Sequence, residues 1–285
     1  MILLDRLRRN FPSAKRQTLK RMVQDRRVLI NGVPAARLTQ SIQPQDRIVI
    51  GSAKKSPQPT LPFPIIFEDE DILVIDKPAG LLTSTVPREP RPTALAAVNR
   101  YLRATDPAAR VGLIHRLDRD ASGVLVFSKN PAAYASLKRQ FFHHTVTRIY
   151  HAIVSPPPPK DSGRIESRLI ERADGTVHST RQASKGQRAV TDYTIMKRQG
   201  DQALLKITLQ TGRKHQIRVH LSESGSPIVG DTLYGGKPHN GLQLRAVELA
   251  FDHPRTQNRI SFFPQESRPR RGGGLSPLVI TPFPR

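Results

Sequence analysis

Two apolar runs in the middle of the chain, residues 112–117 and 123–127, have the pattern of β-strands separated by a short polar turn. Asp118 stands where the first run meets the turn, between Arg116 and Arg119. Because loops held by rigid strands commonly carry functional side chains, this predicted hairpin is a candidate site. A structural role is the alternative, since a turn aspartate can cap the turn and pair with a neighbouring arginine.

Similar runs predict the other elements of the region around this hairpin. Strands are expected at 65–67, 72–75, 148–154, 164–171, 189–198, 203–209, 227–229 and 242–251. Helices are expected at 93–102, 130–143 and 213–222. Thr93 and Asn130 are the expected N-caps of the first two helices, and Pro131 occupies the first turn of the second. The region therefore mixes strands and helices along its whole length.

The first fifty residues predict a separate small unit. Helices are expected on either side of Pro12, the second capped by Ser13, and short strands follow around a turn at Asn31-Gly32. The unit holds eleven Lys and Arg residues against three Asp residues. A solvated charged face is the structural alternative, but such faces usually mix both signs, and this one scarcely does. A surface suited to phosphate groups is the better interpretation.

Composition marks the boundaries between these regions. Residues 51–63 are rich in Pro, Ser and Lys and have no periodicity, which predicts a linker between the unit at 1–50 and a larger domain at 64–263. Residues 264–285 also lack a periodic pattern, and we expect a disordered or loosely attached tail.

The charge balance indicates the kind of partner. The chain has 46 Lys and Arg residues against 23 Asp and Glu residues, a formal net charge of +23. A charge of this size attracts polyanions, of which nucleic acid is the commonest. An anionic membrane would require an amphipathic anchor or a lipidation signal, and neither pattern is found.

Other classes are disfavoured by what the sequence lacks. It has no cysteine, which excludes disulfides, thiolate catalysis and zinc–sulfur sites. No apolar run is long enough to span a membrane, and the first residues do not form a signal peptide. We therefore expect a cytoplasmic protein.

Four segments of the larger domain carry a resemblance to a known family. They are DKPAGLL at 76–82, HRLDRDASGVLVFSK at 115–129, TGRKHQIRVHL at 211–221 followed by SGSPIVGDTLYG, and ELAFDHP at 248–254. In this order and spacing they resemble the RluA-type pseudouridine synthases. Residues 1–50 resemble the alpha-L RNA-binding domain shared with a ribosomal small-subunit protein. The resemblance implies an α+β fold with a mixed, mainly antiparallel central sheet and flanking helices, plus a small α/β RNA-binding domain.

The implied activity is the isomerisation of chosen uridines in RNA to pseudouridine, without a metal or other cofactor. Asp118 matches the essential carboxylate of that family, which stabilises or traps the electron-poor anomeric carbon left when the glycosidic bond breaks. Arg218 matches the arginine that keeps this carboxylate ionised. Tyr150 matches the tyrosine that stacks on uracil and is a candidate acceptor for the proton from carbon 5. A covalent adduct and a glycal route both stay open.

Further residues are candidates for contacts with substrate or RNA. In the larger domain they are Lys77, Arg116, Arg213, His215 and Gln216. In the small unit they are Arg16, Lys20, Arg21 and Arg27. By resemblance, Arg116 fills the space that an extruded uridine vacates. His215 and Gln216 are expected to fix the start of the helix at 213–222 instead of acting as acid or base.

Alternatives remain for these assignments. Arg218 could instead be a surface phosphate contact, and Tyr150 could be an ordinary strand tyrosine. A non-catalytic ribosome-assembly factor on the same fold is the first rival function. A nucleoside hydrolase or glycosidase is the second, with Asp120 as its second carboxylate.

The expected substrate follows from the domain organisation. The basic unit at 1–50 favours large-subunit ribosomal RNA over transfer RNA, and we expect a monomer. Four departures from the family pattern bear on the target. Ala121 replaces a usual Thr, Lys214 a small polar residue and Arg245 a common His, and the first segment continues as LTSTV.

Overall fold

The hydrophobic run after residue 71 becomes a buried strand near one edge of a large sheet. The computed structural model describes residues 1–51, 60–85, 90–182 and 184–264. In it, β5 (Ile72–Lys77) lies between β4 (Ile65–Glu68) and β7 (Ser122–Ser128) and pairs antiparallel with both. Every residue of β5 is buried. Because side chains alternate between the two faces of a sheet, both faces are covered at this strand.

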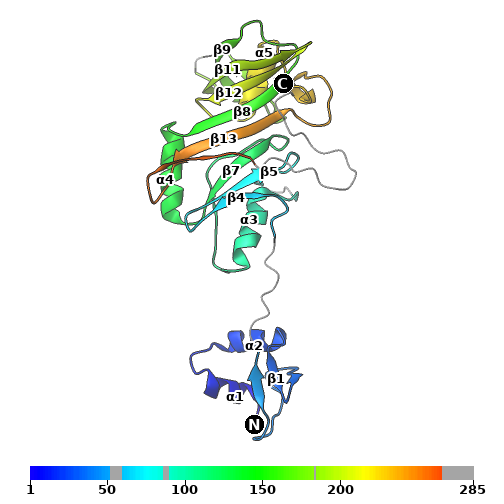
Figure 1. Cartoon of the computed structure of the whole chain (residues 1–285), viewed down its shortest axis with the longest axis vertical. Helices are drawn as coiled ribbons and strands as arrows, with labels where there is room; N and C mark the ends of the chain where they lie inside the picture. Colours follow the sequence, from blue (N-terminus) through cyan, green and yellow to red (C-terminus); the bar gives the residue numbers. More distant parts are fainter. Residues whose placement is uncertain (52–59, 86–89, 183, 265–285) are drawn as a thin grey trace. The chain divides into compact units, whose positions relative to one another are not determined.

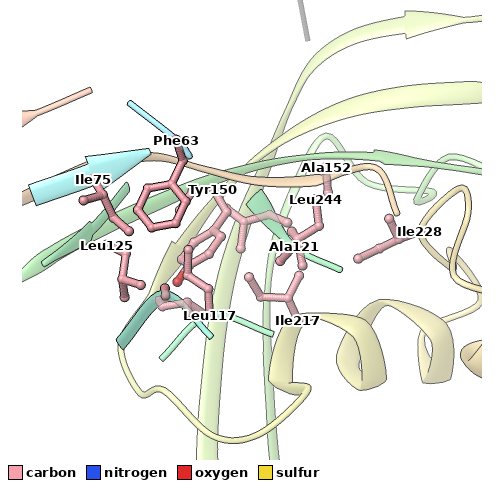
Figure 2. Packing of buried hydrophobic residues seen from close by; sticks show 14 of the residues in the cluster. Phe63, Ile75, Leu117, Ala121, Leu125, Tyr150, Ala152, Ile217, Ile228 and Leu244 are labelled. Atoms are coloured by element: carbon pink, nitrogen blue, oxygen red, sulfur yellow. The ribbon is translucent and has the colours of Figure 1, made fainter. Parts of the chain in front are cut away.

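Two hydrophobic clusters provide this cover. Ile75 belongs to the larger cluster, together with residues of α3 (Ala94–Arg103), whereas its neighbour Val74 belongs to a second cluster with residues of α4 (Pro131–Phe142). The predicted caps of these helices are confirmed: the side chains of Thr93 and Asn130 accept hydrogen bonds from backbone N–H groups of the first turn. The larger cluster continues to the site described below (Figure 2).

The sheet extends beyond β7 through most of the larger region (Figure 1). Its other strands are β6 (Gly112–Leu113), β8 (Thr147–Val154), β9 (Ser162–Glu171), β10 (Val177–Thr180), β11 (Gln187–Gln199), β12 (Gln202–Leu209), β13 (Leu244–Asp252) and β14 (Arg259–Phe262). Its order is β10-β9-β11-β12-β8-β13-β7-β5-β4, with β14 beside β13 and β6 beside β7. Among the described residues, β13 and β7 form the one parallel pair. The predicted mixed, mainly antiparallel α+β fold is confirmed.

Two predicted elements are shorter than expected. The strand at 112–117 ends at Leu113, and an irregular loop then carries the chain from Ile114 to Ala121. The helix expected from residue 213 is α5 (Gln216–Glu223), which packs against β9, β10 and β11. His215 precedes α5 in the left-handed region, with φ of 53°, so a regular helix cannot run through it.

The small unit has a three-stranded antiparallel sheet beside two helices (Figure 1). Its elements are α1 (Leu3–Asn10), α2 (Arg16–Gln24), β1 (Val28–Ile30), β2 (Val33–Pro34) and β3 (Ile48–Ile50). Leucines of both helices form its core with Val28. The prediction that Ser13 caps α2 is wrong: Lys15 is the N-cap residue, and no side chain caps the helix.

The chain separates into two compact units, Met1–Gln58 and Pro59–Arg285. Most of the predicted linker, residues 52–59, lies outside the described residues, whereas Phe63 at its end is buried in the core of the second unit. The predicted tail lies outside the described residues from position 265 onward. Within the described parts of the chain, no helix is both long and apolar enough to cross a membrane.

Candidate active site

The loop that carries Asp118 is held by the segment that follows β5. Thr83 Oγ1 donates a hydrogen bond to the carbonyl of Leu117 at 2.7 Å and accepts one from its N–H at 3.2 Å. On the other side of Asp118, the ammonium of Lys77 donates to the carbonyl of Arg119 at 3.0 Å. The backbone on both sides of Asp118 is therefore fixed by side chains from a different segment, which limits where its carboxylate can point.

Lys77 therefore has a different role from the expected RNA contact. Its side chain is completely buried, and its ammonium also donates to the carbonyls of Pro78 and Leu81, at 2.9 and 2.8 Å. Burial lowers the pKa of Lys77 to about 8, against the opposing effect of nearby aspartates. An ammonium enclosed by three carbonyls is not accessible to RNA, so the structure corrects this assignment: Lys77 ties the DKPAG segment to the loop that carries Asp118.

The structure brings Asp118 and Arg218 together. Arg218 lies on α5 and is buried, and its Nη1 is 3.7 Å from Asp118 Oδ2. A surface phosphate contact, the alternative for Arg218, does not agree with this burial. The arginine's closer partner is Asp231, whose two carboxylate oxygens accept from Nε at 2.7 Å and from Nη2 at 2.8 Å. The ring of Tyr234 lies against the same guanidinium, 4.9 Å from Cζ.

These contacts fix the charge of Arg218 beside the loop. Burial alone would lower the pKa of Arg218, but the hydrogen bonds and charge of Asp231, and the charge of Asp118, raise it above its usual value. Because the bidentate pair leaves Nη1 directed toward Asp118, Asp231 holds the positive charge of Arg218 beside the Asp118 carboxylate. Asp231 lies in the SGSPIVGDTLYG segment, and the sequence alone predicts no role for it.

Tyr150 shares a cavity with Asp118. It projects from β8, is nearly fully buried and packs beside Phe63 and Leu117 (Figure 2). Burial raises the pKa of Tyr150 to about 12, the nearby Arg148 lowers it and the charge of Asp118 adds to the increase. At neutral pH Tyr150 is therefore a neutral phenol in the lining of the cavity.

The cavity has a volume of about 810 Å³, within the usual range for small-molecule sites. Its lining joins the loop at 113–121, the end of α4, part of β8 and the turn at 212–217. Arg116 and Arg213, two predicted substrate contacts, are exposed parts of this lining. Arg213 lies in the turn before α5, and its Nε donates to the carbonyl of Arg188 at 3.2 Å.

Gln216 and His215 hold the start of α5. The amide of Gln216 is buried and makes four hydrogen bonds: it accepts from Thr211 and the N–H of Arg213, and donates to Val190 and Thr191. This arrangement confirms that Gln216 fixes the helix start and leaves no amide group free for RNA, which corrects that part of its assignment. His215 Nδ1 is hydrogen-bonded to the hydroxyl of Tyr234 at 2.8 Å.

His115, for which the sequence gives no role, is a neutral structural group. Its Nε2 accepts a hydrogen bond from the N–H of Val126 at 3.3 Å, and its ring stacks on Phe141 at 4.9 Å. Burial lowers the pKa of His115 to about 3, with a further contribution from the charges of Arg148 and Lys138. It is therefore unprotonated at neutral pH.

The predicted RNA contacts of the small unit are mostly accessible. Arg16, Lys20 and Arg21 are exposed on α2, with Arg21 forming a loose pair with Asp25 at 3.9 Å. Arg27 is half-buried and donates from Nε to a backbone carbonyl of the same unit. RNA binding by these residues stays a prediction.

One group of metal-ligand residue types occurs in the described parts of the chain, formed by Asp69, Asp71 and His253. His253 Nε2 is 2.8 Å from the carboxylate of Asp69, and Asp71 is paired with Arg255 and Asn130. Because these protein contacts already satisfy the three residues, we assign no metal to them.

The site defines an enzyme class: one carboxylate beside a buried arginine, in a nucleotide-sized cavity whose other charged lining residues are basic. The chain matches the family model for RNA pseudouridylate synthase over residues 71–223. A Bacillus subtilis protein described as the uncharacterized RNA pseudouridine synthase YlyB is 34% identical over 257 residues, which cover 87% of this chain and 84% of the relative. The chain belongs to the RNA pseudouridylate synthase family and is an RNA pseudouridine synthase.

Other relatives agree with this assignment. Ribosomal large subunit pseudouridine synthase D of Escherichia coli K12 is 32% identical over 233 residues, covering 80% of this chain and 71% of the relative. The solved structure of human RNA pseudouridylate synthase domain containing 4 shares the fold, with a TM-score of 0.60 and 24% identity over 70% of this chain and 87% of that chain.

Proposed function

We propose that this enzyme isomerises uridines of large-subunit ribosomal RNA to pseudouridine, with Asp118 as the catalytic carboxylate. The observation that carries the residue assignment is the 3.7 Å approach of Arg218 to Asp118 on a loop whose backbone is fixed on both sides. The names of relatives such as the Escherichia coli large-subunit enzyme support the choice of RNA. A cytoplasmic location and a monomeric state belong to the same proposal.

In the proposed reaction, the bond between the ribose anomeric carbon and uracil N1 breaks and a bond to carbon 5 replaces it. The ionised Asp118 faces the positive charge that develops on the anomeric carbon, either by bonding to it or by stabilising it electrostatically. The bond from the anomeric carbon to carbon 5 then forms, which in the covalent alternative breaks the bond to Asp118 and returns its carboxylate; one proton leaves carbon 5 and N1 gains one. Because one bond of the nucleotide is exchanged for another, the reaction as a whole is redox-neutral, and we propose no cofactor.

Arg218 and Tyr150 support this chemistry in different ways. Arg218, anchored by Asp231, places a positive charge beside Asp118 in a site that substrate closes to water. Tyr150 presents its ring to the uracil. Removing its phenolic proton at pH 7 costs about 7 kcal/mol for a pKa of about 12. We therefore assign stacking to Tyr150 and not the removal of the carbon 5 proton.

The small unit contributes affinity in this proposal. Arg16, Lys20 and Arg21 on the exposed side of α2 contact RNA phosphates, and Arg116 enters the space left by the extruded uridine. The glycosidase alternative needs a second carboxylate in the cavity. Among the described lining residues Asp118 is the only acid, and Asp120 is paired with Arg119 at 2.8 Å. The arrangement favours isomerisation.

The test compares pseudouridine maps of ribosomal and transfer RNA from cells with and without the gene, and from cells carrying Asp118→Asn or Asp118→Ala. We expect at least one large-subunit position to lose its pseudouridine in the deletion and in both variants, while purified variants bind that RNA within a few-fold of wild type. Asp120→Asn serves as the matched control. Retained modification in Asp118→Ala would refute the catalytic assignment, and loss confined to transfer RNA would refute the substrate.

A further inference from the structure

A buried arginine in the cavity wall is not used by the chemistry described above. Arg148 lies on β8, two residues before Tyr150, and only 9% of its surface is exposed. Its Nη2 donates to the carbonyls of Leu209 and Gln210, at 3.3 Å each. Its Nε is buried without a hydrogen-bond partner, and no carboxylate among the described residues pairs with its guanidinium.

An unpaired buried guanidinium is unusual because taking a charge out of water is costly unless an anion or strong acceptors compensate. Two long hydrogen bonds to neutral carbonyls and the ring of Phe141, whose centroid is 5.7 Å from Cζ, compensate for this cost only in part. Burial lowers the pKa of Arg148, and the neighbouring Arg213 adds to the effect while Tyr150 opposes it. A bound anion would supply the missing partner, since it would take up the free N–H and balance the charge.

The surroundings of Arg148 favour the same kind of ligand. Lys138 and Arg213 line this side of the cavity, whereas Asp118, the one acid among the described lining residues, lies beside Arg218. The field here is therefore positive and lacks a protein counter-charge. The planar fork of an arginine suits two oxygens of one phosphate group.

The residue at position 212 keeps this guanidinium in place. A Cβ atom built on Gly212 would lie 2.5 Å from Nη1 of Arg148. The backbone of Gly212 does not itself require a glycine, because its φ is outside the left-handed region. Glycine at this position thus leaves room for the charged end of Arg148 at the cavity wall.

We propose that Arg148 binds a phosphodiester group of the RNA strand that carries the target uridine, inside the active-site cavity. This inference rests on the proposed function. When a nucleotide is extruded from folded RNA, its flanking phosphates move with it, and each brings one negative charge to the cavity. Arg148 would fix the sugar-phosphate backbone on one side while Tyr150, on the same strand, faces the base.

The experiment pairs protein variants with chemically neutralised RNA. Its substrate is a short fragment around a uridine that the wild-type enzyme modifies, made once unaltered and once for each flanking phosphate replaced by an uncharged methylphosphonate. Arg148→Met removes the guanidinium, and Arg148→Lys keeps the charge. Lys160→Met is the matched control, because it removes an exposed cation beyond the far end of β8. kcat/KM is measured for each combination.

We expect one of the two neutral linkages to lower the kcat/KM of the wild-type enzyme by roughly 10- to 100-fold, the range for a lost charged hydrogen bond. Arg148→Met should show a similar loss on unaltered RNA and no further loss on that modified RNA. Arg148→Lys should recover part of the activity, and Lys160→Met should behave as wild type throughout.

Other outcomes would separate the two hypotheses. If each neutral linkage lowers the kcat/KM of Arg148→Met by as much as that of the wild type, Arg148 contacts no phosphate and this inference is wrong. If Arg148→Met fails to fold, Gly212→Ala replaces it, because its added methyl displaces the guanidinium without removing it, and the same comparison decides. Failure of the wild-type enzyme to modify ribosomal RNA overturns the proposed function instead, before any variant is compared.

Discussion

Thr83 allows a direct test of whether a fixed loop backbone is needed for catalysis. Thr83→Val replaces the hydroxyl by a methyl group of similar size and leaves the side-chain volume nearly unchanged. It removes the hydroxyl that donates to the carbonyl of Leu117 and accepts from its N–H. The two backbone groups lie directly before Asp118 and, being buried, have no ready replacement partner. Thr83→Ser keeps the hydroxyl and is the matched control.

The size of the effect follows from these two hydrogen bonds. Leaving one buried polar group unsatisfied costs about 1–3 kcal/mol, so the two groups left by Thr83→Val should lower the free energy of unfolding by roughly 2–6 kcal/mol if the loop stays in place. For a domain of this size, that corresponds to a fall in Tm of roughly 4–24 °C. If the loop instead moves to reach water, less stability is lost, but a displacement near 1 Å can reduce the rate by about 100-fold.

Both consequences are measurable on the same preparations. Thermal unfolding gives the loss of stability, and single-turnover pseudouridine formation gives the rate of the chemical step. We expect Thr83→Val to lose stability, rate or both, with little change in RNA affinity, and Thr83→Ser to stay close to wild type. Wild-type values of both quantities in Thr83→Val would show that the hydroxyl does not position the loop.

Two further predictions concern neighbouring groups. Asp120→Asn breaks a largely exposed ion pair with Arg119, so stability should change by less than about 1 kcal/mol and activity by no more than a few-fold; a large loss of activity would revive a role for the second carboxylate. His115→Gln tests the buried histidine through pH. Folding lowers the pKa of His115 from 6.5 to about 3, so the unfolded chain binds a proton that the folded chain does not, and stability is lost as pH falls from 6.5 toward 3. Denaturant unfolding at pH 7.5 and pH 5 should show a smaller loss in His115→Gln than in wild type, and an equal loss would contradict the assignment.

The sequence predicts best those features that short segments determine. Thr93 and Asn130 begin their helices as expected, because a cap depends on the residue and the turn that follows it. Strands such as β8 show the alternation that half-burial imposes. The prediction failed at Ser13, where the cap signal is purely local and another backbone conformation competes with it. The helix α2 begins three residues later.

The predicted start of α5 was wrong for a related reason. Apolar spacing extends the helix back to Arg213, yet the left-handed backbone of His215 interrupts it. That conformation is held by tertiary contacts, namely the hydrogen bonds of Gln216 to the preceding turn and of His215 to Tyr234. No pattern within the segment reveals a partner nineteen residues away.

The site shows why matching residues to a family pattern identifies reactive groups more readily than the groups that hold them. Asp118, Arg218 and Tyr150 were found because their chemistry is recognisable at a motif position. Lys77 was misassigned on the same reasoning, since a lysine in a basic protein reads as a phosphate contact until its burial is known. Asp231 was passed over because an aspartate in a turn is common and only the folded chain places it 2.7 Å from Arg218.

Arg148 and Arg218 differ in how the protein compensates their buried charge. Both guanidiniums are buried near one cavity, but Arg218 has two carboxylates within 4 Å, whereas Arg148 has two backbone carbonyls, the ring of Phe141 and a free Nε, with no carboxylate among the described residues. If burial of charge served stability alone, both should have been paired within the protein, because an uncompensated buried charge is destabilising. The paired arginine lies beside Asp118, and the unpaired one remains available to an anion from outside. The chain thus gives up some stability at Arg148, and the bound RNA strand would restore it.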